Sequence, residues 1–230
     1  MIVKDVSAVA RLRRSISRRG FTKTLGLISR ELAVSVRRRW NYCRELRYDR
    51  RNRVETRGIA WQSGLHPPDA VHYQGTMPGV FRRIVASLPI DVRRYLFVDI
   101  GCGKGRTLLI ALELGFRRVI GVELNEHLLA IARRNLASAH DRVDFVLQDA
   151  ARYELPLEPT VVYLYNPFLH ETMRAVLANI ERSVRQVHDD LIVVYYNPVL
   201  RELLDEAPFL RSLYHEADVA VYRGLPLGVS

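Results

Sequence analysis

Three glycines occupy alternate positions in the segment LFVDIGCGKGR, residues 96–106, which begins with a run of apolar residues. Glycines so spaced let a backbone approach a ligand closely. Arg106 stands where a dinucleotide-binding fingerprint requires its third glycine, and the Gly-Lys-Ser/Thr ending of a triphosphate-binding loop is missing. A carboxylate at Asp99 would repel a pyrophosphate but could pair with an ammonium group. The segment therefore favours a ligand with an amino-acid end.

Apolar, β-rich runs alternate with helical stretches from residue 94 onward. Strands are predicted at 95–100, 118–124, 143–149, 160–166 and 191–197, with helices at 104–115, 125–139, 151–154 and 168–187 between them. This order implies right-handed βαβ units and a parallel sheet with helices on both faces. A further helix at 198–205 and two adjacent runs, 209–216 and 219–224, predict an antiparallel hairpin at the sheet edge. We therefore expect a Rossmann-like α/β fold: a doubly wound, mostly parallel seven-stranded sheet ending in that hairpin.

Three strand-end motifs, DIGCGKG (99–105), GVEL (121–124) and LQDA (147–150), follow one another in the chain. In this order they resemble those of the class I S-adenosylmethionine (SAM)-dependent methyltransferases, over roughly residues 70–225. The chain is similar to bacterial-type members and has some resemblance to the non-SET lysine methyltransferases. The resemblance implies SAM as the cofactor.

The resemblance also assigns cofactor-binding residues. The glycine loop would wrap the methionine part of SAM, and an acidic residue ending the second strand would accept both ribose hydroxyls. The third strand end would accept the adenine amino group and offer a backbone N–H. The residues implied are Asp99, Gly101, Cys102, Gly103, Glu123, Leu124, Asp149 and Ala150.

Each of these features has an ordinary structural interpretation when taken alone. The glycine loop could be a tight turn, Glu123 a solvated strand-end carboxylate, and Asp149 the N-cap of a short helix. Their joint occurrence at successive strand ends, on one edge of one sheet, favours the cofactor site.

The segment YLYNPF, 163–168, follows the fourth predicted strand. It resembles the Asn-Pro-Pro-aromatic motif of amino-methylating enzymes, with one proline missing. The carbonyls of Asn166 and Pro167 can accept hydrogen bonds from an N–H nucleophile, and Phe168 can form a wall. An ordinary strand exit is equally compatible, because Tyr-Asn-Pro recurs at 196–198. The similarity to non-SET lysine methyltransferases makes a lysine amine a reasonable acceptor.

Two further groups of residues are candidates near this site. Tyr73 and Thr76, in VHYQGT, lie where related methyltransferases carry a segment that closes over SAM, although a plain surface linker is also possible. His170 and Tyr165 are the candidate general bases, and His170 could equally be a capping or surface residue. The other histidines lack the spacing of metal ligands, so we predict no metal.

Charge divides the chain into two parts. Residues 1–60 hold 17 Lys and Arg against 5 Asp and Glu, a net charge of +12, while the remainder is close to neutral within a total of +10. We predict a basic helical N-terminal extension, 1–60, and a methyltransferase domain, 61–230. Helices are expected at 21–39 and about 6–18, with an irregular polar segment at 48–58.

The extension allows several partners. It could attract nucleic acid or an acidic protein, lie on an anionic membrane, serve as an organellar transit peptide, or only form a solvated helical face. Two cysteines are too few for a disulfide framework and favour a reducing compartment, and no apolar stretch is long enough to span a bilayer. We expect a cytoplasmic protein without a transmembrane segment.

The sequence thus predicts an enzyme that methylates a nitrogen, with a protein lysine slightly ahead of another amine. Two alternatives remain open. One is O-methylation of a small acceptor, and the other is a nucleic-acid-associated protein that uses the fold as a scaffold and binds through its basic extension.

Overall fold

The computed structural model describes residues 36, 39–58, 75–165, 168, 170–187 and 190–225. They fall into two compact units, Met1–Arg47 and Tyr48–Ser230. In the first unit, residues 39–47 are helical, and the helical assignment continues to residue 52 in the second unit. The prediction of an irregular segment at 48–58 is therefore wrong for residues 48–52, which are helical. The predicted helix at 6–18 and nearly all of that at 21–39 lie outside the described residues.

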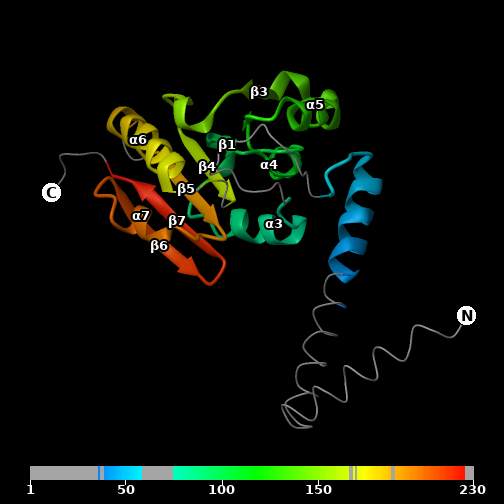
Figure 1. Ribbon diagram of the computed structural model, residues 1–230, viewed down its shortest axis with the longest axis horizontal. Helices are drawn as coiled ribbons and strands as arrows, with labels where there is room; N and C mark the ends of the chain where they lie inside the picture. The colour runs from blue at the N-terminus through cyan, green and yellow to red at the C-terminus, as the bar shows by residue number, and fades with distance from the viewer. Residues whose placement is uncertain are drawn as a thin grey trace, which may run out of the picture. The chain divides into compact units, whose positions relative to one another are not determined.

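The second unit contains a seven-stranded sheet with the order β3-β2-β1-β4-β5-β7-β6 (Figure 1). The strands are β1 (Leu96–Ile100), β2 (Arg118–Glu123), β3 (Val143–Leu147), β4 (Thr160–Tyr165), β5 (Leu191–Tyr196), β6 (Leu210–Glu216) and β7 (Val219–Gly224). All neighbouring pairs from β3 to β5 are parallel, and β7 is antiparallel to both β5 and β6. The predicted fold class and the C-terminal hairpin are confirmed.

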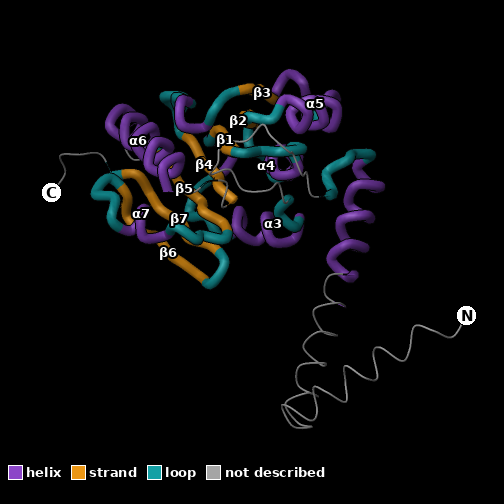
Figure 2. Tube along the Cα trace, in the orientation of Figure 1, coloured by secondary structure: helices purple, strands orange, loops and turns teal. Residues whose placement is uncertain are grey.

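Helices cover both faces of the sheet, as Figure 2 shows for the orange strands and the purple helices. The α-helices are α3 (Pro78–Ala86), α4 (Arg106–Glu113), α5 (Glu126–Asn135), α6 (His170–Val187) and α7 (Arg201–Asp205). The short 3₁₀ helices are η1 (Val92–Arg94), η2 (Ala137–Arg142) and η3 (Ala150–Arg152). One buried apolar cluster joins α3, α4 and α5 to the sheet, and a second joins α6, α7 and η3 to the other face.

Burial explains why the strands are apolar along their whole length. All five residues of β1 are buried, and β4 and β5 are buried except at their last residue. A strand covered on both faces has no polar side to alternate with, which is the pattern of a parallel sheet. The central strands thus form a rigid platform, and their carboxyl ends carry the polar residues.

The compact second unit begins at Tyr48, whereas the domain boundary was predicted near residue 60. Polar contacts buried in the unit account for the difference. Thr56 is 0% exposed and donates its hydroxyl to Asp49, which is also buried. Residues 48–58, which we call the strap, therefore pack as part of the sheet-containing unit.

Candidate cofactor and acceptor site

The carboxyl ends of β1 and its two neighbours lie at the point where the strand order reverses. β1 pairs with β2 on one side and with β4 on the other, and all three strands run in parallel. In open α/β sheets, ligands bind in the crevice outside the carboxyl ends of the strands at such a switch point. The residues that follow these strands are therefore the candidate site.

The glycine loop, residues 101–105, is fastened to β2 by its backbone. The N–H groups of Gly101 and Cys102 both donate to the Val122 carbonyl, at 2.8 and 3.0 Å. Gly103 has a φ of +53°, in the left-handed region that favours glycine. Gly105 has a φ of +78°, and a Cβ there would lie 2.8 Å from Cδ1 of Leu136. The loop geometry thus requires glycine on both backbone and packing grounds.

Cys102 directs its thiol into the core. A Cβ at Gly121 of β2 would lie 2.7 Å from its Sγ, so the thiol packs directly over the bare backbone of that strand. Burial raises the pKa of the Cys102 thiol well above its ordinary value, and the neighbouring carboxylates of Glu123 and Asp99 raise it further. The side chain is a packing element here, and only the backbone of this residue could face a ligand.

Glu123, at the end of β2, closes the loop from the side. Its Oε2 accepts from the N–H of Gly103 and its Oε1 from the N–H of Asn125, both at 2.9 Å. The residue is half-buried, and the next residue, Leu124, is 40% exposed. Because each carboxylate oxygen has two lone pairs, this fixed carboxylate can accept further hydrogen bonds.

Asp99 is buried at the end of β1, with 4% exposure, and accepts a hydrogen bond from the Thr107 hydroxyl. Burial raises the pKa of this carboxyl from 3.8 to about 7; the Thr107 hydroxyl opposes the rise and Glu123 adds to it. Because the pKa of Asp99 lies close to neutral pH, a cationic ligand can change its protonation state: a nearby ammonium group favours the ionised carboxylate.

Asp149 follows β3 and caps the short helix η3. Its Oδ1 accepts from the N–H of Ala151 at 2.9 Å. Ala150 is buried, and its carbonyl accepts from the Asn179 side chain of α6 at 3.4 Å. The capping interpretation of Asp149 is therefore realised, and the cofactor role stays a prediction alongside it.

The predicted acceptor motif is only partly described. Asn166, Pro167 and the lid residue Tyr73 lie outside the described residues. Phe168 is half-buried and packs against the apolar cluster on the α6 face, and His170 is exposed at the start of α6.

An aromatic pair stands at the strand ends next to this motif. Tyr165 and Tyr196 are the last residues of β4 and β5 and are partners in the sheet register. Their ring centroids are 4.7 Å apart, and both residues are half-buried. The second Tyr-Asn-Pro motif is a strand exit: Asn197 has a φ of +50° and donates its N–H to Asp218 in the hairpin turn.

Thr76 is 2% exposed, and its hydroxyl lies 2.7 Å from the hydroxyl of Tyr163 in the middle of β4. Burial, the largest effect, raises the pKa of the Tyr163 phenol well above its ordinary value, so the phenol is neutral and can donate. The predicted lid residue Thr76 is therefore bound to β4, the strand between β1 and β5.

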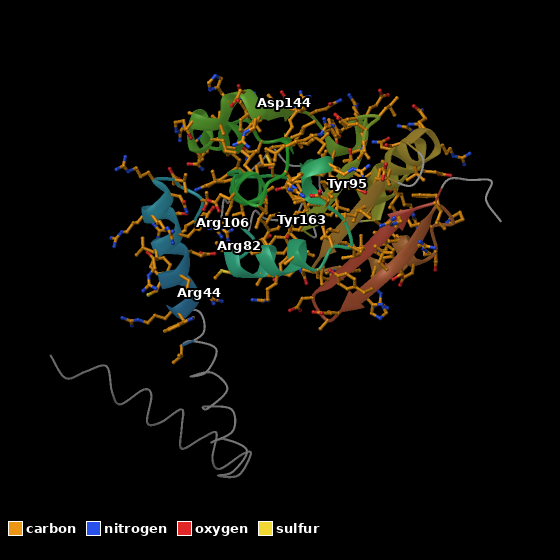
Figure 3. All side chains as sticks on the ribbon, turned by 180° about the vertical axis from the view of Figure 1, so that it is seen from behind. Arg44, Arg82, Tyr95, Arg106, Asp144 and Tyr163 are labelled. Carbon is orange, nitrogen blue, oxygen red and sulfur yellow. The ribbon has the colours of Figure 1, made fainter. Side chains whose placement is uncertain are left out.

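Two functional candidates were missed in the sequence. Lys104 and Arg106 follow the loop glycines and are both buried, and Arg106 is only 2% exposed (labelled in Figure 3). Their contacts reach residues 47 to 50 positions earlier in the chain. The sequence signal for these two residues was the basic pair in GKGR, residues 103–106. In the sequence alone, Arg106 indicated only that the loop differs from nucleotide-binding loops.

Within the described ranges, no group of three His, Cys, Asp or Glu residues is placed to hold a metal ion. None of the helices in those ranges is long and apolar enough to cross a membrane.

Comparison with known proteins agrees with this geometry. Residues 97–187 match the family model described as a methyltransferase domain. Over these residues the chain is similar to the class I SAM-dependent methyltransferases. An RNA methyltransferase from Salinibacter ruber, solved with S-adenosyl-L-homocysteine, has the same fold: the TM-score is 0.50 at 23% identity, over 68% of this chain and 97% of that one.

Two curated methyltransferases are similar in sequence. The ribosomal protein L11 methyltransferase of Alteromonas mediterranea is 33% identical over 100 residues, which is 42% of this chain and 30% of the relative. That of Tolumonas auensis is 31% identical over 78 residues, 34% of this chain and 23% of the relative. The chain thus spans less than a third of the length of these relatives.

The raised pKa of Asp99 predicts how the stability of the sheet-containing unit depends on pH. Between 3.8 and about 7 the folded protein holds a proton on Asp99 that the unfolded chain has released. This contribution to stability is complete below the lower value and is lost as the pH rises to about 7. Asp99→Asn, which is neutral throughout, should lack this loss.

Urea unfolding of the ligand-free wild type and Asp99→Asn at about pH 5 and pH 8 measures the effect. The free energy of unfolding should fall more in the wild type, by on the order of 1–3 kcal/mol between these two pH values. An equal fall in both proteins would contradict the assignment.

Proposed function

We propose that the chain is a SAM-dependent N-methyltransferase that acts on an amine of a macromolecule, with a protein lysine first among the candidates. One observation carries the cofactor half of the proposal. Asp99, Glu123 and Asp149 lie at, or within two residues of, the carboxyl ends of the adjacent strands β1, β2 and β3, and the glycine loop follows β1 and is bonded to β2.

The side chains present fit this cofactor. Glu123 is held by two backbone N–H groups, and its carboxylate would accept hydrogen bonds from the two ribose hydroxyls. Asp99 would become ionised beside the ammonium of the methionine end. The carboxylate of Asp149, with Oδ1 used as a cap, has Oδ2 for the adenine amino group. SAM, when bound, supplies an electrophilic methyl on a sulfonium centre.

The chain's own contribution to the transfer is alignment. The carbonyls of Asn166 and Pro167 would accept hydrogen bonds from the attacking N–H and direct its lone pair at the methyl group. Tyr165 and Tyr196 would flank the acceptor and exclude water. Transfer forms a carbon–nitrogen bond and breaks a carbon–sulfur bond, and the amine proton leaves to water or to His170 at the start of α6.

Three observations favour a macromolecular amine over a small alcohol. The acceptor motif offers carbonyl acceptors that an N–H donor can use and a hydroxyl nucleophile needs less. The aromatic pair at the ends of β4 and β5 offers ring faces that attract a cationic amine. The sequence relatives are methyltransferases of a ribosomal protein.

Glu123→Ala tests the cofactor site. We expect it to raise the dissociation constant for S-adenosylhomocysteine by at least about tenfold, because two hydrogen bonds to a charged group are lost. The measurement is isothermal titration of the purified chain. Glu126→Ala removes an exposed carboxylate three residues later and should leave the affinity unchanged. No binding by the folded wild type would contradict the proposed function.

Asn166→Ala tests the acceptor. With methyl-labelled SAM and a ribosomal protein fraction as acceptor, transfer should fall by about 10²-fold while the affinity for SAM stays constant, because only the acceptor loses its alignment. Label should appear on lysine in the digested product. Turnover that survives the substitution would favour O-methylation, and label found in RNA would replace the lysine assignment.

The helix of the first unit supports an anionic partner. Trp40, Arg44 and Arg47 are spaced by four and three residues, so they lie on one helix face, and all are exposed; Arg44 is labelled in Figure 3. Arginine and an aromatic ring on one face suit phosphate contact and base stacking. We propose RNA as this partner, which would bring the enzyme to an RNA-containing substrate.

The salt dependence of binding tests this partner. Arg44→Gln together with Arg47→Gln should weaken binding to a structured RNA and reduce the slope of log K against log salt by about 1–2. Arg142→Gln with Arg211→Gln removes two exposed arginines of the second unit and serves as the control. Equal slopes for both double variants, or an affinity independent of salt, would argue against RNA.

A cytoplasmic location remains part of the proposal. Cys43 and Cys102 are both free thiols, one exposed and one buried, which suits a reducing compartment.

A further inference from the structure

The strap, residues 48–58, is clasped by the two basic residues of the glycine loop. The Lys104 ammonium donates to Oε1 of Glu55 at 2.8 Å and to the Arg57 carbonyl at 2.9 Å. This hydrogen bond, more than any other effect, lowers the pKa of the Glu55 carboxyl. Asn135, at the end of α5, accepts from the Glu55 N–H and donates to the Lys104 carbonyl, both at 2.9 Å. The strap is thus bound at once to the loop and to the helix beside it.

Arg106 makes the central contacts of the clasp (labelled in Figure 3). Its Nε donates to the Thr56 hydroxyl at 2.7 Å and one terminal nitrogen to the Thr56 carbonyl at 2.8 Å. The other terminal nitrogen donates to the carbonyls of Gly75 and Thr76, at 3.2 and 3.3 Å. One guanidinium therefore joins the strap, the first turn of α4 and the segment that contains the predicted lid residue.

The charge of Arg106 is balanced through Thr56. The Thr56 hydroxyl accepts from Arg106 and donates to Asp49 at 2.5 Å. Asp49 is 4% exposed and also accepts from the N–H groups of Thr56 and Arg57. A buried cation and a buried anion are thus connected by one hydroxyl, beside the direct ion pair that Asp49 makes with Nε of Arg57 at 3.2 Å.

Geometry makes this network specific. The planar fork of arginine presents donors in fixed directions, which a lysine ammonium at the same place does not. Breaking one partner of a buried ionic network is costly because the remaining charge stays buried. The network therefore fixes the relative positions of the strap, the first turn of α4 and the Gly75–Thr76 segment.

The arrangement extends to the cofactor side of the sheet. Thr76, whose carbonyl Arg106 binds, also contacts the Tyr163 hydroxyl through its side chain. Arg106 itself directly follows Gly105, whose N–H is bonded to the Cys102 carbonyl. A shift of the guanidinium would move the glycine loop and the Gly75–Thr76 segment together.

We propose that Arg106 is a positioning residue for the cofactor, and that the strap, through Thr56 and Asp49, is a working part of the SAM site. The inference rests on the proposed function, since it assumes that the glycine loop holds SAM. It extends the site to residues about fifty positions before the loop.

Three full-length variants test the proposal, each titrated calorimetrically with S-adenosylhomocysteine well below its unfolding midpoint. Thr56→Val keeps the shape of the side chain but removes the hydroxyl, and Arg106→Lys keeps the charge but removes the fork. Both should raise the dissociation constant by about tenfold or more. Thr56→Ser restores the hydroxyl and should bind within about threefold of the wild type.

Thermal unfolding and far-ultraviolet circular dichroism are recorded for each variant. A purely structural role would lower the unfolding midpoint of Thr56→Val and Arg106→Lys and leave the dissociation constant unchanged, which would overturn the inference alone. Failure of the wild type itself to bind would instead overturn the proposed function. If Thr56→Val does not fold, Arg106→Lys with a wild-type dichroism spectrum decides the question.

Discussion

The carbonyl oxygen of Val122 accepts two backbone N–H groups from the glycine loop, and the placement of the candidate site depends on this attachment. It sets the loop at the height of β2, so that the next residue, Glu123, can accept from Gly103. The attachment is possible because Gly121 lets Cys102 lie directly over β2. A larger residue at Gly121 would separate the loop from the strand, and Glu123 would lose its contact with Gly103.

Much of the fold could be predicted from the sequence because the sheet is buried on both faces. Continuous apolar runs marked the central strands β1, β4 and β5, and all seven strands were predicted to within one or two residues at each end. The strand-end carboxylates were also predictable, since a polar residue that closes an apolar run has to lie at the sheet edge. Asp99 and Glu123 are placed there, and Asp149 shows that one carboxylate can cap a helix at the same edge.

The strap could not be predicted in the same way. Asp49, Thr56 and Arg106 are buried polar residues, and their hydrogen bonds join segments about fifty residues apart in the chain. Such contacts leave no periodicity in either segment. The sequence of the strap therefore predicted an irregular polar segment, and Arg106 was interpreted only as a departure from a glycine motif. The net charge gave no sign of this either, because it does not distinguish exposed arginines such as Arg44 and Arg47 from the buried cations Lys104 and Arg106.

The contacts of Arg106 with the strap affect the order in which the chain folds during synthesis. Synthesis proceeds from the N-terminus, so the strap leaves the ribosome before Arg106 has been translated. Until then Asp49 has its ion-pair partner Arg57 within the strap, but the contacts between Thr56 and Arg106 cannot form. For the glycine loop the order is reversed. When Arg106 is translated, its partner Thr56 has already been synthesised. Closure of this long loop is therefore a late, non-local step of folding, and a chain shortened at the compositional boundary near residue 60 would lack the segment that completes it.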